Sequence, residues 1–384
     1  MPVYLDHAAT TPMLPAARAA LIAALDLVGN PSSIHTHGQS AKRILEEARE
    51  VIAGSLGCDP IEIVLTSGGT ESVNLGVKGL FWARDTSVVS RKRILVPRGE
   101  HHATIDAAEW LVAHEGAVIE WLPIDELGRI SIDSVAQSLR EHDDIALLTM
   151  LWANNEVGTV QPVAEIVALA AERGVPVHVD AVAAYGHLPV SLRESGAAAI
   201  SVSAHKVGGP LGMGALTLAR TAVVEPLLHG GGQQRNVRSG TQDAPAAVAF
   251  AAAVEHPPAP LTHLRDALIA GVRSAVPDAV LRGDPRDRLD NNAHFTFPGC
   301  AGDSLLFMLD SAGISASTGS ACQAGIPEAS HVLLGMGLSE AEARGALRFT
   351  LGHDSTAADI EALLSVLPDA VARARRAGYS NRAV

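Results

Sequence analysis

Short apolar, β-branched segments alternate with longer amphipathic ones from Glu62 to about Ala219. Seven of the apolar segments have the length and composition of strands: "EIVLT", "RILVP", "AVIEWLP", "DIALLTML", "VPVHVD", "AAISVS" and "GALTLA". Between them, "ESVNLGVKGLFWA" and "VAEIVALAAERG" are spaced as helices. Near-continuous apolar strands separated by helices predict an α/β fold with a mostly parallel sheet covered on both faces. Ligands in such folds bind beyond the carboxyl ends of the strands.

A Pro-rich break, "PPAPLTHL" from Pro257 to Leu264, interrupts this alternation. The chain then continues with a helix, the strands "AVLRG" and "NAHFTFP", a helix from Asp303 and a long closing helix from about Thr356. We therefore predict a large domain of residues 15–256. A small α+β domain is predicted to consist of residues 1–14 and 257–384.

Composition argues against several classes of function. The 384 residues include 42 acidic and 29 basic ones, and the net charge of -13 disfavours nucleic acid or an anionic membrane as the main partner. No apolar run approaches the roughly 18 residues of a membrane span. The start, "MPVYLDHAATTP", has an aspartate and a histidine where a signal peptide needs a basic residue and an apolar centre. We expect a soluble, cytoplasmic protein.

The cysteines are Cys58, Cys300 and Cys322. Their odd number and lack of paired spacing support neither a disulfide framework nor a Cys-x-x-Cys zinc site, and we expect no metal.

The stretch "SVSAHKVGGPLG" places Lys206 at the end of an apolar strand, where a lysine is unusual. Asp180 ends the preceding strand, so a simple salt bridge between the two is one interpretation. Pyridoxal phosphate (PLP) is the other, because it needs a lysine for covalent attachment and a carboxylate to keep its ring nitrogen protonated. Its phosphate needs hydroxyl, imidazole and backbone donors. "SGGTES", with Gly69 and Thr70, offers such donors, although alone it is more often an ordinary turn.

Motifs along the whole chain resemble those of the cysteine desulfurases, PLP enzymes of the aspartate-aminotransferase fold (fold type I). They are, in order, "YLDHAATTP", "GNPSSIHTHG", "TSGGTESVN", "EHHAT", "ANNEVGT", "HVDAV", "SAHKVGGPLG", "RSGTQ", "STGSACQAG" and "RFTLG". "NPSSIHTHG" and the long segment after Cys322 resemble most the subgroup that serves iron–sulfur cluster assembly.

The resemblance implies a role for each residue that matches a family motif. Lys206 would bond to the cofactor, Asp180 would pair with the pyridinium nitrogen, and His101 would stack on the ring, although a capping or core histidine is the plainer reading of His101. The other implied contacts are Asn155 near the ring oxygen and, for the phosphate, the turn at Gly69 with Thr70, Ser203 and His205. Thr241 matches a phosphate ligand donated by a second subunit, which implies a homodimer.

The same resemblance implies the substrate and the reaction. Arg348 would bind the carboxylate of L-cysteine through its planar fork. Cys322, among small residues in "STGSACQAGIP", would take the sulfur as a persulfide and pass it to an acceptor, either an iron–sulfur scaffold protein or a tRNA-thiolating enzyme. Cys58 and Cys300 are better explained as buried, inert thiols. A selenocysteine lyase, an aminotransferase and a non-catalytic platform for partner proteins are the alternatives.

Three positions depart from the family pattern. Ala183 stands where glutamine usually bonds to the ring oxygen, Gly69 where alanine is common, and His353 where arginine is common. The loss of one hydrogen bond, roughly 0.5–1.5 kcal/mol, predicts weaker cofactor binding at most.

Overall fold

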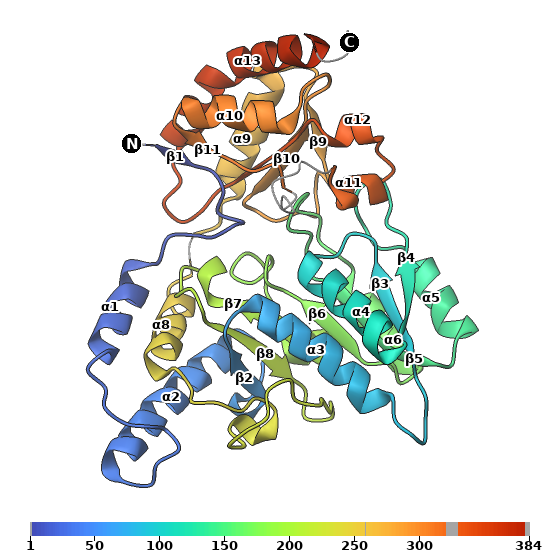
Figure 1. Ribbon diagram of the computed structural model, residues 1–384. Helices are drawn as coiled ribbons and strands as arrows, with labels where there is room; N and C mark the ends of the chain where they lie inside the picture. The colour runs from blue at the N-terminus through green and yellow to red at the C-terminus, as the bar shows by residue number, and fades with distance from the viewer. Residues whose placement is uncertain (1, 258, 320–328, 381–384) are drawn as a thin grey trace.

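The computed structural model describes residues 2–257, 259–319 and 329–380, with side chains to residue 376. A seven-stranded sheet forms its centre (Figure 1) in the order β2-β8-β7-β6-β5-β3-β4. Its strands are β2 (Ile63–Thr66), β3 (Arg93–Pro97), β4 (Val118–Leu122), β5 (Ile145–Leu151), β6 (Val177–Asp180), β7 (Ala199–Ser203) and β8 (Gly214–Leu218). β8 runs antiparallel to both neighbours, and the other pairs are parallel. The predicted mostly parallel seven-stranded sheet is confirmed.

Alternation along the strands supplies a core on each face of this sheet. In β2, Val64 belongs to the core under α3 and α4, whereas Ile63 and Leu65 belong to the core under α2, α6 and α8. Successive side chains of a strand point to opposite faces, so apolar residues at every position require helices on both. The helices of this part are α1 (Pro15–Ala24), α2 (Thr36–Ser55), α3 (Gly69–Arg84), α4 (His102–Glu115), α5 (Ile132–Glu141), α6 (Val163–Glu172), α7 (Leu192–Ser195) and α8 (Ala244–Val254). We call the sheet and these helices the large lobe.

A second group of elements, which we call the small lobe, lies beyond one end of the large sheet (Figure 1). Its antiparallel sheet has the order β12-β10-β9, and β1 pairs with β11. Its elements are β1 (Val3–Tyr4), β9 (Val280–Arg282), β10 (Asn292–Thr296), β11 (Ile314–Ser315), β12 (Ala346–Thr350), α9 (Thr262–Ala275), α10 (Gly302–Ser311) and α13 (Ala357–Ser380). Two short helices precede β12: α11 (His331–Gly335) lies on the side of the small lobe toward the large one, and α12 (Glu340–Ala343) lies beside the small sheet (Figure 1).

The core of the small lobe combines Leu5 with residues from 261 to 374, whereas Leu14 packs into the core of the large lobe. The predicted domain boundaries remain a prediction. In the part of the chain that the structure describes, no helix is both long enough and apolar enough to cross a membrane.

The N-terminal segment links the two lobes. Thr350 of β12 donates its amide to Leu5 O at 2.8 Å, and Asp6 forms an isolated parallel bridge with Thr350. The chain then passes the end of β7, where Thr11 donates its amide to His205 O at 3.2 Å. Residues 6–11 therefore lie between the end of the large sheet and the small lobe.

Candidate active site

A cavity of about 360 Å³ lies at the carboxyl edge of the seven-stranded sheet. Both lobes line it, since Asp180 and Lys206 come from the large lobe and Ser317 and Arg348 from the small one. The predicted site residues found in its lining are Gly69, Thr70, His101, Asn155, Asp180, Ser203, His205, Lys206 and Arg348. The cavity thus brings together residues from six separate motifs.

Lys206 closes the short 3₁₀ turn η2 (Ala204–Lys206) that follows β7. Its Nζ donates to the carbonyl oxygens of Ala8 and Ala9, the latter at 2.9 Å. Burial lowers the pKa of Lys206 to about 8, and the Arg348 guanidinium adds to the shift. Within the described structure Lys206 makes no direct ion pair with Asp180, so the simple salt bridge is not what holds this lysine.

Asp180 is the last residue of β6 and is buried, with 2% of its surface exposed. Its Oδ1 accepts a hydrogen bond from Val182 N at 2.9 Å. Burial raises the pKa of Asp180 to about 6, whereas the Val182 amide and the Lys206 ammonium act in the opposite direction. A cationic ring nitrogen in the pocket would supply the counter-charge that favours the ionised carboxylate.

The N-terminus of α3 and the end of β7 form a corner of the cavity that offers hydrogen-bond donors. Ser203 Oγ is buried and has no hydrogen-bond partner in the structure. Gly69 begins α3, where the first amides of a helix point outward without intrahelical partners. A Cβ at position 69 would lie 2.8 Å from Val182 Cγ2, so Val182 fills the space that an alanine would need. An unpaired hydroxyl beside free helix amides fits a phosphate group.

His205 and Thr70 complete this corner. Nδ1 of His205 lies 3.2 Å from Thr10 Oγ1, and burial together with Lys206 lowers the pKa of His205 to about 4. Thr70 is exposed toward the open cavity. A neutral imidazole and a hydroxyl are both available as uncharged donors, so the residues present fit PLP.

His101 is the N-cap of α4, and its Nδ1 accepts a hydrogen bond from Ala103 N at 3.1 Å. His101 is therefore a capping residue, as the simpler interpretation of the sequence predicted, and it also lines the pocket. His101 is exposed toward the open cavity, and desolvation by the surrounding cavity walls together with the Lys206 ammonium lowers its pKa to about 4. A neutral ring whose Nδ1 accepts carries its proton on Nε2.

Arg348 lies in β12 and is 5% exposed. Its Nη1 donates to Asn155 O at 2.9 Å, and its Nη2 donates to Asp6 Oδ1 at 2.8 Å. Its Nε is buried without a partner. The edge formed by Nε and Nη2 can therefore bind a carboxylate through two parallel hydrogen bonds.

Two carboxyl groups in the lining were not singled out from the sequence. Glu100 is 1% exposed; its Oε1 accepts from Leu151 N at 2.8 Å, its Oε2 has no partner, and burial raises its pKa well above the usual value. Glu156 is also buried, and its Oε2 accepts from Ser330 Oγ at 2.5 Å. Both lie inside recognised motifs, next to His101 and Asn155 in the sequence. This proximity to predicted site residues could have identified them as candidates.

Some predicted residues lie elsewhere. Thr241 is exposed and is not part of the cavity lining. Cys322 falls outside the described residues. Cys58 and Cys300 are both buried, and burial raises the pKa of both thiols, that of Cys58 to about 12. Ala183 does line the cavity, whereas His353 lies in a separate small cavity behind Lys206.

Comparison with known proteins gives the same picture over the whole chain. The family model for class-V aminotransferases matches residues 3–363. The chain is 53% identical to an IscS-like cysteine desulfurase of Mycobacterium tuberculosis, over 98% of both chains. It superposes on a NifS-like protein with a TM-score of 0.88 at 30% identity, covering 97% of this chain and 100% of the other. The structure of SspA in complex with cysteine matches with a TM-score of 0.81 at 32% identity, over 92% and 99%. The chain therefore belongs to the class-V aminotransferase family, whose cofactor is PLP, and within it to the cysteine desulfurases.

Proposed function

We propose that this protein converts L-cysteine to L-alanine and carries the removed sulfur as a persulfide on Cys322. The observation that carries the proposal is one pocket lined by a lysine of lowered pKa, by a buried carboxylate and by an arginine whose Nε has no hydrogen-bond partner. The relatives named as cysteine desulfurases and the cysteine complex of SspA support the substrate.

Each residue has a role that follows from its surroundings. Lys206, Asp180, Ser203, His205, Thr70, Asn155 and the α3 amides at Gly69 would hold PLP, with His101 against its ring. When bound, PLP supplies an electron sink that stabilises negative charge at the substrate's Cα. Arg348 binds the substrate carboxylate through Nε and Nη2. His101 presents its Nε2–H to the pocket as a hydrogen-bond donor.

Lys206 moves the Cα proton. With a pKa of about 8, about a tenth of its side chains are neutral amines at pH 7, a larger fraction than an ordinary lysine offers. The carbonyl oxygens of Ala8 and Ala9 hold the amine within the pocket.

The sulfur leaves by attack of a thiolate. Cys322 attacks the substrate sulfur, an S–S bond forms, and the Cβ–S bond breaks with its electron pair left on carbon. Protonation of that carbon gives the methyl group of L-alanine. Cys58 and Cys300 are poor candidates, because their thiols donate to Ala53 O and Val371 O inside the two cores and their raised pKa values disfavour the thiolate.

The proposal includes a homodimer in which Thr241 reaches the phosphate of the partner's site. Thr241 follows a turn in which Gln234, Arg235 and Asn236 have φ values of 49°, 61° and 63°. Such a conformation is unfavourable for residues with a Cβ and is retained where the surroundings fix it. Gln234 fixes it here, because its side-chain amide accepts from Leu65 N at 2.7 Å and donates to Leu65 O at 2.8 Å.

The persulfide would be passed to an acceptor protein, either an iron–sulfur scaffold or a tRNA-thiolating enzyme. The choice between them depends on the partner's surface.

Cys322→Ser tests the proposed function. We expect the variant to keep the absorption band of bound cofactor and to show its shift on addition of L-cysteine, yet to release almost no alanine and to gain no 32 Da adduct. Cys58→Ser and Cys300→Ser are the matched controls and should keep the parent activity. Mass spectrometry that found the sulfur on Cys58 or Cys300, or alanine release by Cys322→Ser at the parent rate, would refute the proposal.

A further inference from the structure

Four successive backbone carbonyls, those of residues 155–158, each accept a hydrogen bond from the small lobe. We call residues 155–158 the seam segment. The donors are Arg348 Nη1 to Asn155 O at 2.9 Å, Asn292 Nδ2 to Glu156 O at 3.0 Å, Arg288 Nη2 to Val157 O at 3.1 Å and Leu289 N to Gly158 O at 2.9 Å. Because Asn155 and Glu156 also line the active-site cavity, the seam segment connects that cavity to the small lobe.

Arg288 holds the middle of this contact. It is 4% exposed and donates through Nε to Asn292 O at 3.2 Å, through Nη1 to Asp284 O at 3.2 Å and through Nη2 to Val157 O. Burial lowers the pKa of Arg288 to about 10, so the guanidinium stays charged at neutral pH. In the described part of the chain no carboxylate forms an ion pair with it. A buried cation that binds only neutral oxygens is costly, and such groups are retained where they fix a geometry.

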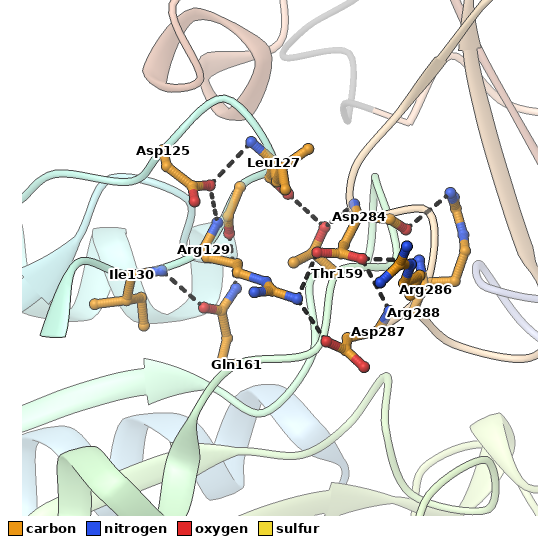
Figure 2. Close-up of polar contacts among 11 residues, drawn as sticks. Asp125, Leu127, Arg129, Ile130, Thr159, Gln161, Asp284, Arg286, Asp287 and Arg288 are labelled. Carbon is orange, nitrogen blue, oxygen red and sulfur yellow. Dashed lines mark hydrogen bonds and ion pairs between the residues drawn. The ribbon is translucent and has the colours of Figure 1, made fainter.

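Figure 2 shows how the outer end of the contact is braced. Nη2 of Arg129 lies 2.5 Å from a carboxylate oxygen of Asp284 and 2.5 Å from one of Asp287. Thr159, the residue after the seam segment, donates its hydroxyl to Leu127 O at 2.6 Å and accepts from Asp284 N at 2.9 Å. The loop that carries Arg288 is thus tied to the large lobe by ion pairs and hydrogen bonds, and Arg288 has little freedom to move.

The seam segment in turn fixes Arg348. Arg348 lines the cavity. Asn155 O and Asp6 Oδ1 occupy one donor each of its Nη1 and Nη2, and on the edge that Nε forms with Nη2 the buried Nε has no hydrogen-bond partner. A shift of Asn155 O would rotate the guanidinium and misalign that edge. A bidentate contact loses strength steeply when either hydrogen bond is bent.

We propose that Arg288 is a positioning residue for the substrate carboxylate, acting through the seam segment on Arg348. This inference rests on the proposed role of Arg348 in carboxylate binding. It predicts that Arg288 influences the affinity for ligands that carry a carboxylate and leaves ligands that lack it unaffected.

L-alanine and ethylamine form a suitable pair of probes, since they differ only by the carboxylate. Their dissociation constants are measured with the holoenzyme from the shift of the cofactor band. In Arg288→Gln we expect the preference for L-alanine over ethylamine to fall about tenfold, which corresponds to about 1.4 kcal/mol. In Arg288→Lys, which keeps the positive charge but not the planar guanidinium, this preference should fall by less.

Arg49→Gln is the matched control. Arg49 is also buried, at 5% exposure, and donates to Ile63 O and to the side chain of Gln242, but it touches neither the seam segment nor the loop that carries Arg288. We expect a similar loss of thermal stability and an unchanged preference for L-alanine. Equal preferences in Arg288→Gln and the parent, at a comparable loss of stability, would overturn the inference.

Two further variants keep the outcome decisive. Arg129→Gln serves if Arg288→Gln does not fold, because Arg129 is the more exposed residue that pairs with Asp284 and Asp287. It should lower the preference for L-alanine two- to threefold. An unchanged preference in Arg129→Gln or in Arg288→Lys would overturn the inference. Arg348→Gln should abolish the preference. If it does not, the proposed role of Arg348 fails, whereas a loss in Arg348→Gln without one in Arg288→Gln rejects the role of Arg288 alone.

Discussion

The floor of the pocket and the seam segment hold their groups by different means. On the floor, Asp180, Ser203 and Lys206 lie at the ends of adjacent parallel strands, and burial shifts the pKa values of both ionisable residues toward neutrality. In the seam segment, backbone carbonyls accept hydrogen bonds, and the buried charge nearby, Arg288, stays ionised. The floor therefore sets the protonation states of the pocket residues, and the seam segment sets the positions of the groups bound to it. Variants of the floor should therefore mainly lose activity, and variants of the seam segment should mainly lose stability and affinity for L-alanine.

Lys206→Ala should give the largest effect. We expect alanine and sulfide formation to fall by at least about 10³-fold, because the variant loses both the covalent anchor and the base. The protein should not become less stable at neutral pH, since the bonds of Lys206 to two carbonyls are offset by the burial of its ammonium. Lys42→Ala, at an exposed position of α2, is the control. Turnover by Lys206→Ala near the parent rate would remove Lys206 from the mechanism.

Asn292→Ala removes a contact of the seam segment and should mainly lower stability, whereas Lys206→Ala mainly lowers activity. The substitution leaves Glu156 O without its partner, so we expect a loss of about 1–3 kcal/mol in the free energy of unfolding by urea. Asn291→Ala is the neighbouring control, because Asn291 is buried and donates to Leu351 O rather than to the seam segment. Both variants should be less stable, and weaker binding of L-alanine is expected for Asn292→Ala alone. Equal weakening in both would contradict the separation of the two regions.

Stability at alkaline pH sharpens the account of the floor. The pKa of Lys206 is about 8 in the folded protein against 10.5 for an unperturbed lysine, so between these values the unfolded chain binds more protons. Stability contributed by this residue therefore rises with pH from about 8 to 10.5. In cofactor-free protein, the difference in unfolding free energy between the parent and Lys206→Met should shift in favour of the parent over this range. A difference that is constant with pH would show that Lys206 has an ordinary pKa.

Ala183→Gln should have the smallest effect. Ala183 lines the cavity beside Lys206, where the longer side chain can donate a hydrogen bond to the cofactor. We expect equal or tighter binding of PLP, by less than about tenfold, with a small shift of its absorption band. Equilibrium dialysis and absorption spectra measure both. A tenfold loss of affinity would show that the pocket is shaped around alanine.

How far the sequence predicts this molecule depends on how local each contact is. Lys206 and Asp180 could be identified because each ends a strand, and the strand pattern itself brings their ends together. Arg288 could not be identified from the sequence, because its contact with the seam segment is to Val157, 131 residues earlier in the chain. The capping role of His101 was recognisable as the plainer alternative, but its coexistence with a place in the pocket needs the position of α4.

Two further features depended on tertiary structure. The direction of β8 could not be read from "GALTLA", since an apolar strand has the same composition whether it runs parallel or antiparallel. The left-handed turn at Gln234 was equally hidden, because glutamine, arginine and asparagine would not be chosen for positive φ. That turn exists because Gln234 finds Leu65 on a strand 169 residues away.

The contact between Gln234 and Leu65 also concerns how the protein behaves at high concentration. β2 is an edge strand of the seven-stranded sheet, and exposed strand edges can recruit strands of other molecules. The amide of Gln234 occupies both the N–H and the C=O of Leu65 and so substitutes for one residue of a neighbouring strand. Arg49 covers the next outward carbonyl, that of Ile63, at 2.7 Å. The side chains that hold the strained turn thereby also protect the sheet from edge-to-edge aggregation.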